Sequence, residues 1–298
     1  MPEGESHRVE RQCRGDGILE GERLHARDDG RVRERAVKDA RAQFGRTAAA
    51  YVSSATHASG EDLERLVAVA APRSSERALD LGCGVGHTLR RVAPLVAFAI
   101  GADATFEMIQ AGRASVVTAA NAAFAQADAT ALPFADATFD LATCRLAAHH
   151  FTNARGAFRE VARVLRPGGR FVLVDNYAPD DPALDAYINE LETLRDASHI
   201  RNHTIQGWRA LLEDAGLRAS VESELMTTKI TTEAWLERSQ TPADRAAEVR
   251  RRLRVAPAAA VTTFRINETT FAVPKVVILA TVPAIGARAE RGYRDTFR

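Results

Sequence analysis

The sequence has little cysteine, almost no net charge and no long hydrophobic run. Its three cysteines, Cys13, Cys83 and Cys144, form no CxxC pair and have no clustered histidines beside them, so neither a disulfide framework nor a structural zinc site is predicted. The 40 Lys+Arg and 39 Asp+Glu residues give a net charge of +1, which argues against general electrostatic attraction to nucleic acid or an anionic membrane. No apolar run approaches the roughly 18 residues of a membrane span, and the charged first residues do not resemble a secretory signal. We therefore expect a cytoplasmic protein with reduced thiols and no bound metal.

The chain of 298 residues is 46% hydrophobic, which is enough for one main domain with a large core. Residues 1–42 carry many charges of both signs and almost no aromatic side chains, so we expect a mobile tail there. The polar residues 285–298 are expected to fray. Residues 43–72 contain helix formers, a Ser-Gly break and a terminal proline, which predicts two helices before the first strand.

Short apolar runs alternate with helical stretches after these helices. The predicted strands are ALDL, FAIGAD, AAFAQAD, FDLATC and RFVLVD. A strand-helix-strand repeat implies parallel strands with right-handed crossovers, and hence a doubly wound α/β sheet. Residues 180–216 form an insertion that reads as two helices around a polar loop, and SVESELMTTKI follows as a sixth strand. The last strand, FAVPKVVILATV, is expected to pair with the preceding TFRINE as an antiparallel hairpin, with Pro274 at its protruding start.

The strongest local signal is the loop DLGCGVG at the end of the first strand. Its glycines allow a ligand to approach the backbone closely. A dinucleotide fingerprint would need a small residue where His87 stands, so the spacing disfavours NAD. Asp80, just before the first glycine, would repel a pyrophosphate but suits a ligand with a cationic group.

Two further aspartates end the next two strands. Asp103 follows Gly82 by about 20 residues, the place from which an acidic side chain accepts ribose hydroxyls. Asp128 is positioned to accept from the exocyclic amine of a flat ring, with apolar residues after it. Together the three carboxylates indicate an adenine nucleoside that carries a positive charge.

Four motifs, in this order and spacing, resemble the class I S-adenosylmethionine-dependent methyltransferases: DLGCGVG, GADATFEMIQAGR, QADATALPFADATFDLATCRLAAHHF and FREVARVLRPGGRFVLVDN. The likeness is to the small-molecule branch that includes the ubiquinone and menaquinone biosynthesis C-methyltransferases, and it covers about residues 43–284. It implies a Rossmann-like seven-stranded sheet, mostly parallel with an antiparallel last strand, and S-adenosyl-L-methionine as cofactor. It also implies N-terminal helices at 43–72, a cofactor half at 73–175 and a helical lid insertion at 180–216.

The resemblance assigns cofactor contacts residue by residue. The methionine part would lie against Asp80 and the glycine loop, the ribose against Asp103, and the adenine against Asp128, with Met108 on a ring face. The sequence departs from its relatives at Arg145, which stands where they often carry a small residue. The expected cofactor-binding residues are Asp80, Gly82, Cys83, Gly84, Gly86, Asp103, Ala104, Met108, Asp128, Ala129 and Arg145.

His149 and His150 follow the fourth strand, at the sheet edge where open α/β sheets bind ligands. An imidazole there is suited to take a proton from the acceptor, so both are candidate catalytic bases. The alternative is a histidine that bonds to loop backbone and shapes the pocket wall. Tyr51, His57 and His199 resemble positions at which relatives close over the cofactor, and the alternative for them is an ordinary loop or core role.

The predicted activity is transfer of a methyl group to a small-molecule acceptor by in-line displacement, which needs neither a protein nucleophile nor a metal. Three alternatives stay open at this point: a methyltransferase of nucleic acid or protein, a non-catalytic S-adenosylmethionine-binding protein, and an NAD-linked dehydrogenase. No Asn/Asp-Pro-Pro-aromatic tetrad follows the fourth strand and no basic extension is present, which disfavours the first. The acceptor and the oligomeric state are not specified by any motif.

Overall fold

The structure of the chain is a computed structural model that describes residues 40–115, 119–226 and 230–284. The charged tail predicted at the N-terminus lies outside these residues up to position 39, as do Cys13 and the predicted frayed end at 285–298. Within the described ranges no helix is both long enough and apolar enough to cross a membrane.

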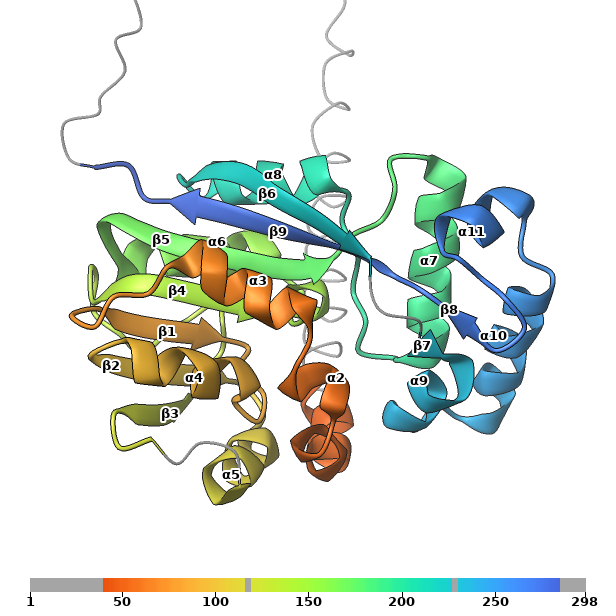
Figure 1. Cartoon of the computed structure of the whole chain (residues 1–298), viewed down its shortest axis with the longest axis horizontal. Coiled ribbons are helices and arrows are strands. Elements are labelled where there is room, and N and C mark those ends of the chain that lie inside the picture. Colours follow the sequence, from red (N-terminus) through yellow and green to blue (C-terminus); the bar gives the residue numbers. More distant parts are fainter. Residues whose placement is uncertain (1–39, 116–118, 227–229, 285–298) are drawn as a thin grey trace, which may run out of the picture.

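A seven-stranded sheet forms the larger part of the molecule (Figure 1). In sheet order the strands are β3 (Ala122–Gln126), β2 (Phe98–Asp103), β1 (Arg77–Leu81), β4 (Phe139–Arg145), β5 (Leu165–Asn176), β9 (Pro274–Thr281) and β6 (Arg218–Met226). The pairs among β1 to β5 are parallel, and β9 is antiparallel to both β5 and β6. This confirms the predicted fold class, a mostly parallel sheet with an antiparallel last strand.

Helices cover both faces of this sheet, which explains why consecutive residues of its central strands are buried. In β5, residues 171–174 are all buried. One face packs against α3 (Glu61–Ala70) and α4 (His87–Val92), and the other against α6 (Ala154–Val164) and α8 (Ile205–Asp214). The two layers appear in front of and behind the sheet in Figure 1.

Six elements from the second half of the chain form a second, smaller group beyond the carboxyl ends of the parallel strands (Figure 1). We call this group the helical unit; it comprises α7 (Pro182–Arg195), β7 (Ile230–Thr231), α9 (Thr232–Arg238), α10 (Ala243–Arg254), α11 (Ala258–Thr263) and β8 (Thr270–Phe271). It has its own hydrophobic core, in which Trp235 packs edge-on against Phe271 with ring centroids 4.8 Å apart. Asp181 caps α7 by accepting from the backbone N–H groups of Ala183 and Leu184, as its Asp-Pro sequence predicts.

The last strand corrects one prediction. TFRINE does not form a hairpin with β9, because Phe264 is buried in the helical unit just after α11 and the chain then enters β8. β8 pairs with β7, while β9 finds its antiparallel partners in β5 and β6. Pro274 is the first residue of β9, as its missing N–H requires.

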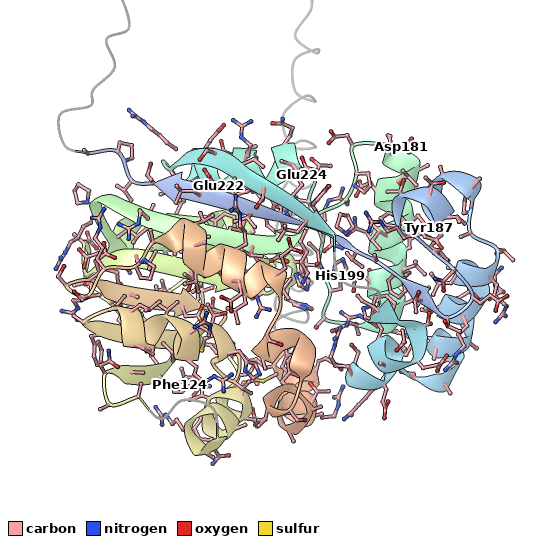
Figure 2. All side chains as sticks on the ribbon, in the orientation of Figure 1. Phe124, Asp181, Tyr187, His199, Glu222 and Glu224 are labelled. Carbon is pink, nitrogen blue, oxygen red and sulfur yellow. The ribbon has the colours of Figure 1, made fainter. Side chains whose placement is uncertain are left out.

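The chain enters the sheet through an N-terminal helix at residues 40–52 and a short helix, α2 (Ala55–Ala58). The 40–52 helix packs toward the glycine loop, because Ala48 shares an apolar cluster with Val85 and Met108. On the loop between α7 and α8, His199 lies between the sheet and α7 (Figure 2). These elements surround the carboxyl end of the sheet.

Candidate active site

A cavity opens at the carboxyl ends of β1, β2 and β4, between the sheet, the 40–52 helix and the helical unit. Strand order reverses between β1 and β4, which is the position at which doubly wound sheets bind ligands. Most of the residues predicted from the sequence line it: Tyr51, His57, Gly82, Cys83, Gly84, Asp103, Ala104, Met108, Asp128, Ala129, Arg145, His149 and His150. Asp80, Gly86 and His199 lie close by but are not part of its lining.

The glycine loop adopts left-handed backbone at Gly82 and Gly84, with φ of 64° and 52°. A Cβ on Gly82 would lie 2.6 Å from Cβ of Ala147, so the loop after β4 leaves no room for a side chain there. A Cβ on Gly84 would meet no atom within 4 Å. Bare backbone therefore faces the open cavity at Gly84 and closes the cavity wall at Gly82.

Asp103 ties this loop to the end of β2. Its Oδ2 accepts from the backbone N–H of Gly84 at 2.8 Å, and its Oδ1 accepts from that of Thr105 at 2.8 Å. Each oxygen keeps a further lone pair, so the carboxylate is held in place while it remains able to accept hydroxyl groups. Burial raises the pKa of Asp103.

Asp80 lies directly beneath the loop and is buried. Its Oδ1 accepts from the hydroxyl of Thr143 at 2.8 Å, whereas its Oδ2 is buried with no hydrogen-bond partner. Burial raises the pKa of Asp80 to about 7. A buried carboxylate oxygen without a donor is costly, and a cationic N–H donor bound at the loop would satisfy it.

Asp128 and Met108 shape the far end of the cavity. Asp128 Oδ1 accepts from both the backbone N–H and the hydroxyl of Thr130, at 2.8 and 2.7 Å, which fixes the turn that follows β3. Met108 is buried against Ala48 and Val85 and presents an apolar surface to the same space. A carboxylate edge beside an apolar surface suits a flat heterocycle that bears an amine.

The two adjacent histidines differ in their partners. His149 Nδ1 lies 2.5 Å from Oδ1 of Asp175, and the His149 backbone N–H donates to the other oxygen at 3.2 Å. Burial opposes a charge on His149, but the Asp175 carboxylate outweighs it and raises the pKa of the imidazole. This pairing holds a proton on Nδ1 and leaves Nε2 as the acceptor on a residue that lines the cavity.

His150 is bound differently. Its Nδ1 lies 3.0 Å from the backbone oxygen of Ser198 and its ring packs edge-on against Phe44, 4.9 Å between centroids. Burial and the nearby His149 lower the pKa of His150 to about 4. Burial and the neighbouring imidazole therefore make His150 a weaker base than His149.

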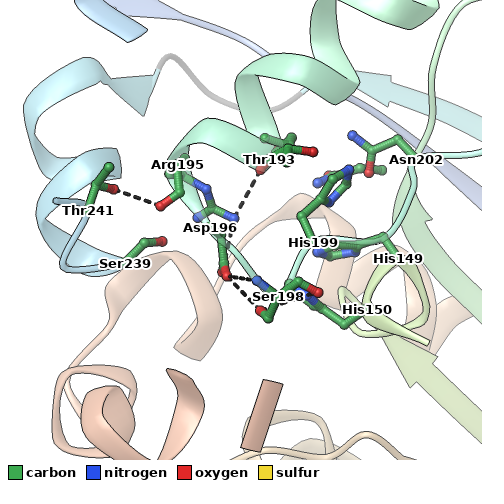
Figure 3. A network of polar contacts seen from close by, with 12 residues as sticks. His149, His150, Thr193, Arg195, Asp196, Ser198, His199, Asn202, Ser239 and Thr241 are labelled. Carbon is green, nitrogen blue, oxygen red and sulfur yellow. Dashed lines mark hydrogen bonds and ion pairs between the residues drawn. The ribbon is translucent and has the colours of Figure 1, made fainter. Parts of the chain in front are cut away.

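His199 belongs to the polar network behind these rings (Figure 3). Its Nε2 lies 3.0 Å from Oδ1 of Asn189, and burial lowers its pKa. In the same network Asp196 accepts from the N–H and the hydroxyl of Ser198 at 2.9 and 2.6 Å. Part of this polar loop between α7 and α8 is thus buried, and Ser198 and His199 lie against the histidine pair.

Arg145 joins the N-terminal elements to the end of β4. Its guanidinium donates to both carboxylate oxygens of Asp62, at 3.0 and 3.2 Å, and to the backbone oxygen of His57 at 2.9 Å. Lys275 also donates to Asp62, at 2.9 Å. The ring of His57 lies 4.8 Å from that of Tyr51, so this buried group of charges positions the Tyr51 side of the cavity.

The helical unit supplies the wall opposite the glycine loop, through Arg195 of α7 and Trp235 and Arg238 of α9. Arg195 lies over the Trp235 ring, with Cζ 4.9 Å from its centroid, and its Nη2 is 3.0 Å from Oε2 of Glu192.

Trp235 and Arg238 were missed from the sequence because no helix was predicted over residues 232–254. Arg195 lies inside the predicted 180–216 insertion, but no pattern marked it as a site residue. Asp175 was missed although the signal was present, an acidic residue at the end of a buried strand, as at Asp80 and Asp103.

Comparison with known proteins agrees with this geometry. A family model described as a methyltransferase domain matches residues 79–173. The chain is 42% identical over 208 residues to the uncharacterized methyltransferase YcgJ of Bacillus subtilis, covering 69% of this chain and 82% of that protein. The crystal structure of YcgJ superposes with a TM-score of 0.70 at 38% identity, covering 74% of this chain and 98% of that one.

A demethylmenaquinone methyltransferase of Clavibacter sepedonicus is 32% identical over 198 residues, 60% of this chain and 79% of that protein. Both alignments are longer than the predicted cofactor half of the chain. The protein is thus a member of the class I S-adenosylmethionine-dependent methyltransferase family.

Proposed function

We propose that this methyltransferase acts on a small-molecule acceptor whose reacting group loses a proton, and that His149 is the base that takes it. The observation that carries the proposal is the contact between His149 and Asp175. His149 lines the same cavity as the glycine loop and Asp103. Loop, carboxylate and base come from the ends of β1, β2 and β4, so one bound pair of reactants would touch all three.

The residues present fit S-adenosylmethionine. The unpaired Oδ2 of Asp80 would accept from its ammonium group, the lone pairs left on Asp103 from its ribose hydroxyls, and Asp128 from its adenine amine. The open space at Gly84 would admit the ligand against bare backbone. When bound, the cofactor supplies a methyl group on a positively charged sulfur that leaves as a neutral thioether.

The chain then has two tasks in the reaction. The first is to hold acceptor and methyl group in attack geometry, which lowers the free-energy barrier by on the order of 7–11 kcal/mol; the 40–52 helix and the helical unit would exclude water from the approach. The second is to remove a proton. Nε2 of His149 accepts the proton that the acceptor loses as its bond to the methyl carbon forms. Asp175 stabilises the imidazolium that results. The predicted roles of Tyr51, His57 and the 180–216 segment in closing the cavity belong to this proposal.

The first test is S-adenosylhomocysteine formation from a panel of phenols, hydroxy acids, amines and demethylmenaquinol, the last suggested by the name of the Clavibacter relative. We expect turnover with at least one acceptor. His149→Ala should lower kcat by roughly 10²–10⁴-fold, the usual contribution of a general base, with cofactor affinity unchanged.

His150→Ala is the matched control, because its ring lies 4.1 Å from that of His149 in the same cavity. It should lower turnover less than His149→Ala. Equal activity in His149→Ala and the wild type would overturn the role of the base. Absence of S-adenosylhomocysteine with every acceptor would favour a non-catalytic binding protein.

A further inference from the structure

The cavity is lined by five basic side chains: Arg41, Arg145, Arg195, Arg238 and Lys275. Four of them have a carboxylate oxygen within 4 Å: Arg41 pairs with Asp128, Arg145 and Lys275 both pair with Asp62, and Arg195 pairs with Glu192. Among the described residues, Arg238 has no such partner. It is therefore the one basic side chain of these five without an ion-pair partner in the described part of the chain.

Arg238 is the last residue of α9, and its side chain is half-buried in the cavity wall. Its Nε is buried without a hydrogen-bond partner in the described part of the chain. Burial and the neighbouring guanidinium of Arg195 lower the pKa of Arg238, so its charge is disfavoured in the free protein. An anion beside it would relieve both the missing hydrogen bond and the repulsion between the two cations.

Charge is also unevenly distributed along the cavity. The acidic side chains Asp103 and Asp128 lie at the ends of β2 and β3, where the adenosine would bind. At the opposite wall Glu192 forms an ion pair with Arg195, with 3.0 Å between Oε2 and Nη2, and Arg238 adds a second cation there. An anionic group is therefore repelled from the cofactor end and attracted to Arg238.

From this we infer that the acceptor is a carboxylate-bearing small molecule, with its carboxylate bound by Arg238. A guanidinium binds a carboxylate in a planar, two-point arrangement, which would fix the acceptor's orientation relative to His149. The inference rests on the proposed function, because it assumes that the acceptor occupies this wall while the cofactor occupies the other.

The test measures binding of benzoate, cinnamate and indole-3-acetate, and of their uncharged primary amides, to full-length protein saturated with S-adenosylhomocysteine. Calorimetry or ligand-observed NMR gives the ratio of affinities within each pair. We expect the wild type to prefer the acids by about tenfold or more, as for a hydrogen bond to a charged group. Arg238→Gln should abolish the preference, and Arg238→Lys should keep part of it.

Arg155→Gln is the matched control, since Arg155 is an exposed arginine paired with Asp214 outside the cavity. It should behave as the wild type. S-adenosylmethionine affinity is measured on every variant, because that molecule also has a carboxylate. Thermal melting of each variant checks that it is folded. If Arg238→Gln is unfolded, the reduced acid preference of Arg238→Lys is the result that decides.

An unchanged acid preference in Arg238→Gln, or no preference in the wild type, would overturn the inference. A loss of S-adenosylmethionine affinity in Arg238→Gln would also overturn it, by assigning the guanidinium to the cofactor. A wild type that binds no S-adenosylhomocysteine at all would instead contradict the proposed function itself.

Discussion

Asp80 and His149 are buried ionisable groups with opposite surroundings. Asp80 has one hydroxyl donor and one oxygen without a donor, whereas His149 has a carboxylate directly against its ring. Burial disfavours charge on both, and only at His149 does a neighbour reverse the effect. The two groups should therefore have different effects on pH dependence, His149 on the reaction rate and Asp80 on the free energy of unfolding.

At His149, the pH profile of kcat/KM should report the base. A general base works in its neutral form, so the rate should fall as pH drops through its pKa, which Asp175 raises above the ordinary histidine value. In Asp175→Asn the acid limb should move to lower pH and kcat should fall by about tenfold or more. An acid limb at the same pH in both proteins would mean that another group titrates.

At Asp80, the free energy of unfolding should depend on pH. Because the pKa in the folded protein is raised to about 7, the unfolded chain loses this proton at lower pH than the folded one does. The contribution of Asp80 to stability is therefore lost as pH rises from about 4 to about 7. Urea unfolding of wild type and Asp80→Asn from pH 5 to 8 should show a smaller decline in the variant.

The same variant should bind S-adenosylmethionine less tightly, since it replaces the oxygen that would accept from the ammonium group. Unchanged affinity together with an unchanged pH dependence would show that Asp80 is neither charged in the complex nor perturbed in the free protein.

At the scale of the elements, the glycine loop contains two glycines, Gly82 and Gly84, that share the left-handed backbone conformation but differ in their surroundings. Gly82→Ala and Gly84→Ala each place an alanine in left-handed backbone, at about 1–2 kcal/mol. Only Gly82→Ala adds a contact of 2.6 Å with Ala147. We expect Gly82→Ala to lower the free energy of unfolding by 1–3 kcal/mol more than Gly84→Ala does.

Gly84→Ala should instead weaken cofactor binding, because its methyl group would project into the open cavity. Denaturant unfolding and titration of both variants separate the two effects. Equal stability of the two variants would show that the loop relaxes away from Ala147.

Strands with a clear local pattern were predicted from the sequence, whereas strand pairing and some helices were not. The parallel strands contain apolar runs with a polar residue at or near the carboxyl end, such as Asp103 of β2 and Arg145 of β4, a signal that depends only on local sequence. The partner of β9 was predicted wrongly because pairing depends on which segment reaches the strand in space, and β6 does so. The helix α10 does carry an apolar face, formed by Ala246, Val249 and Leu253, but it was overlooked among the many arginines of the segment. Ser198 and its neighbour Asp196 are buried although the loop around them is polar.

For the whole molecule, the N-terminal elements are held to the sheet by the buried charges of Asp62, Arg145 and Lys275. Despite burial, Lys275 and Arg145 keep the pKa of Asp62 below its usual value. Asp62→Ala would leave two cations facing each other, so it should lower the free energy of unfolding by about 3–5 kcal/mol. Thermal or urea unfolding measures this.

The control lies on the same helix. Glu64 forms an exposed ion pair with Arg91, and Glu64→Ala should change stability by less than about 1 kcal/mol. If the two variants lose equal stability, the buried charges do not hold the N-terminal elements in place.

The cofactor half of the site was predictable because its residues follow strands directly, so their convergence follows from parallel topology alone. The opposite wall was not, because Arg195 and Arg238 lie 50 and 93 positions after the end of β4 and are brought to the cavity by tertiary packing, which has no local signature.

The central claim is that the glycine loop and Asp103 bind S-adenosylmethionine at the carboxyl edge of this sheet. Calorimetric titration of the cofactor into wild type, Asp103→Ala and the exposed control Asp136→Ala tests it most directly. The account predicts micromolar affinity in the wild type and in Asp136→Ala, with a loss of about tenfold or more in Asp103→Ala. No binding to the wild type, or equal affinity in all three proteins, would contradict it.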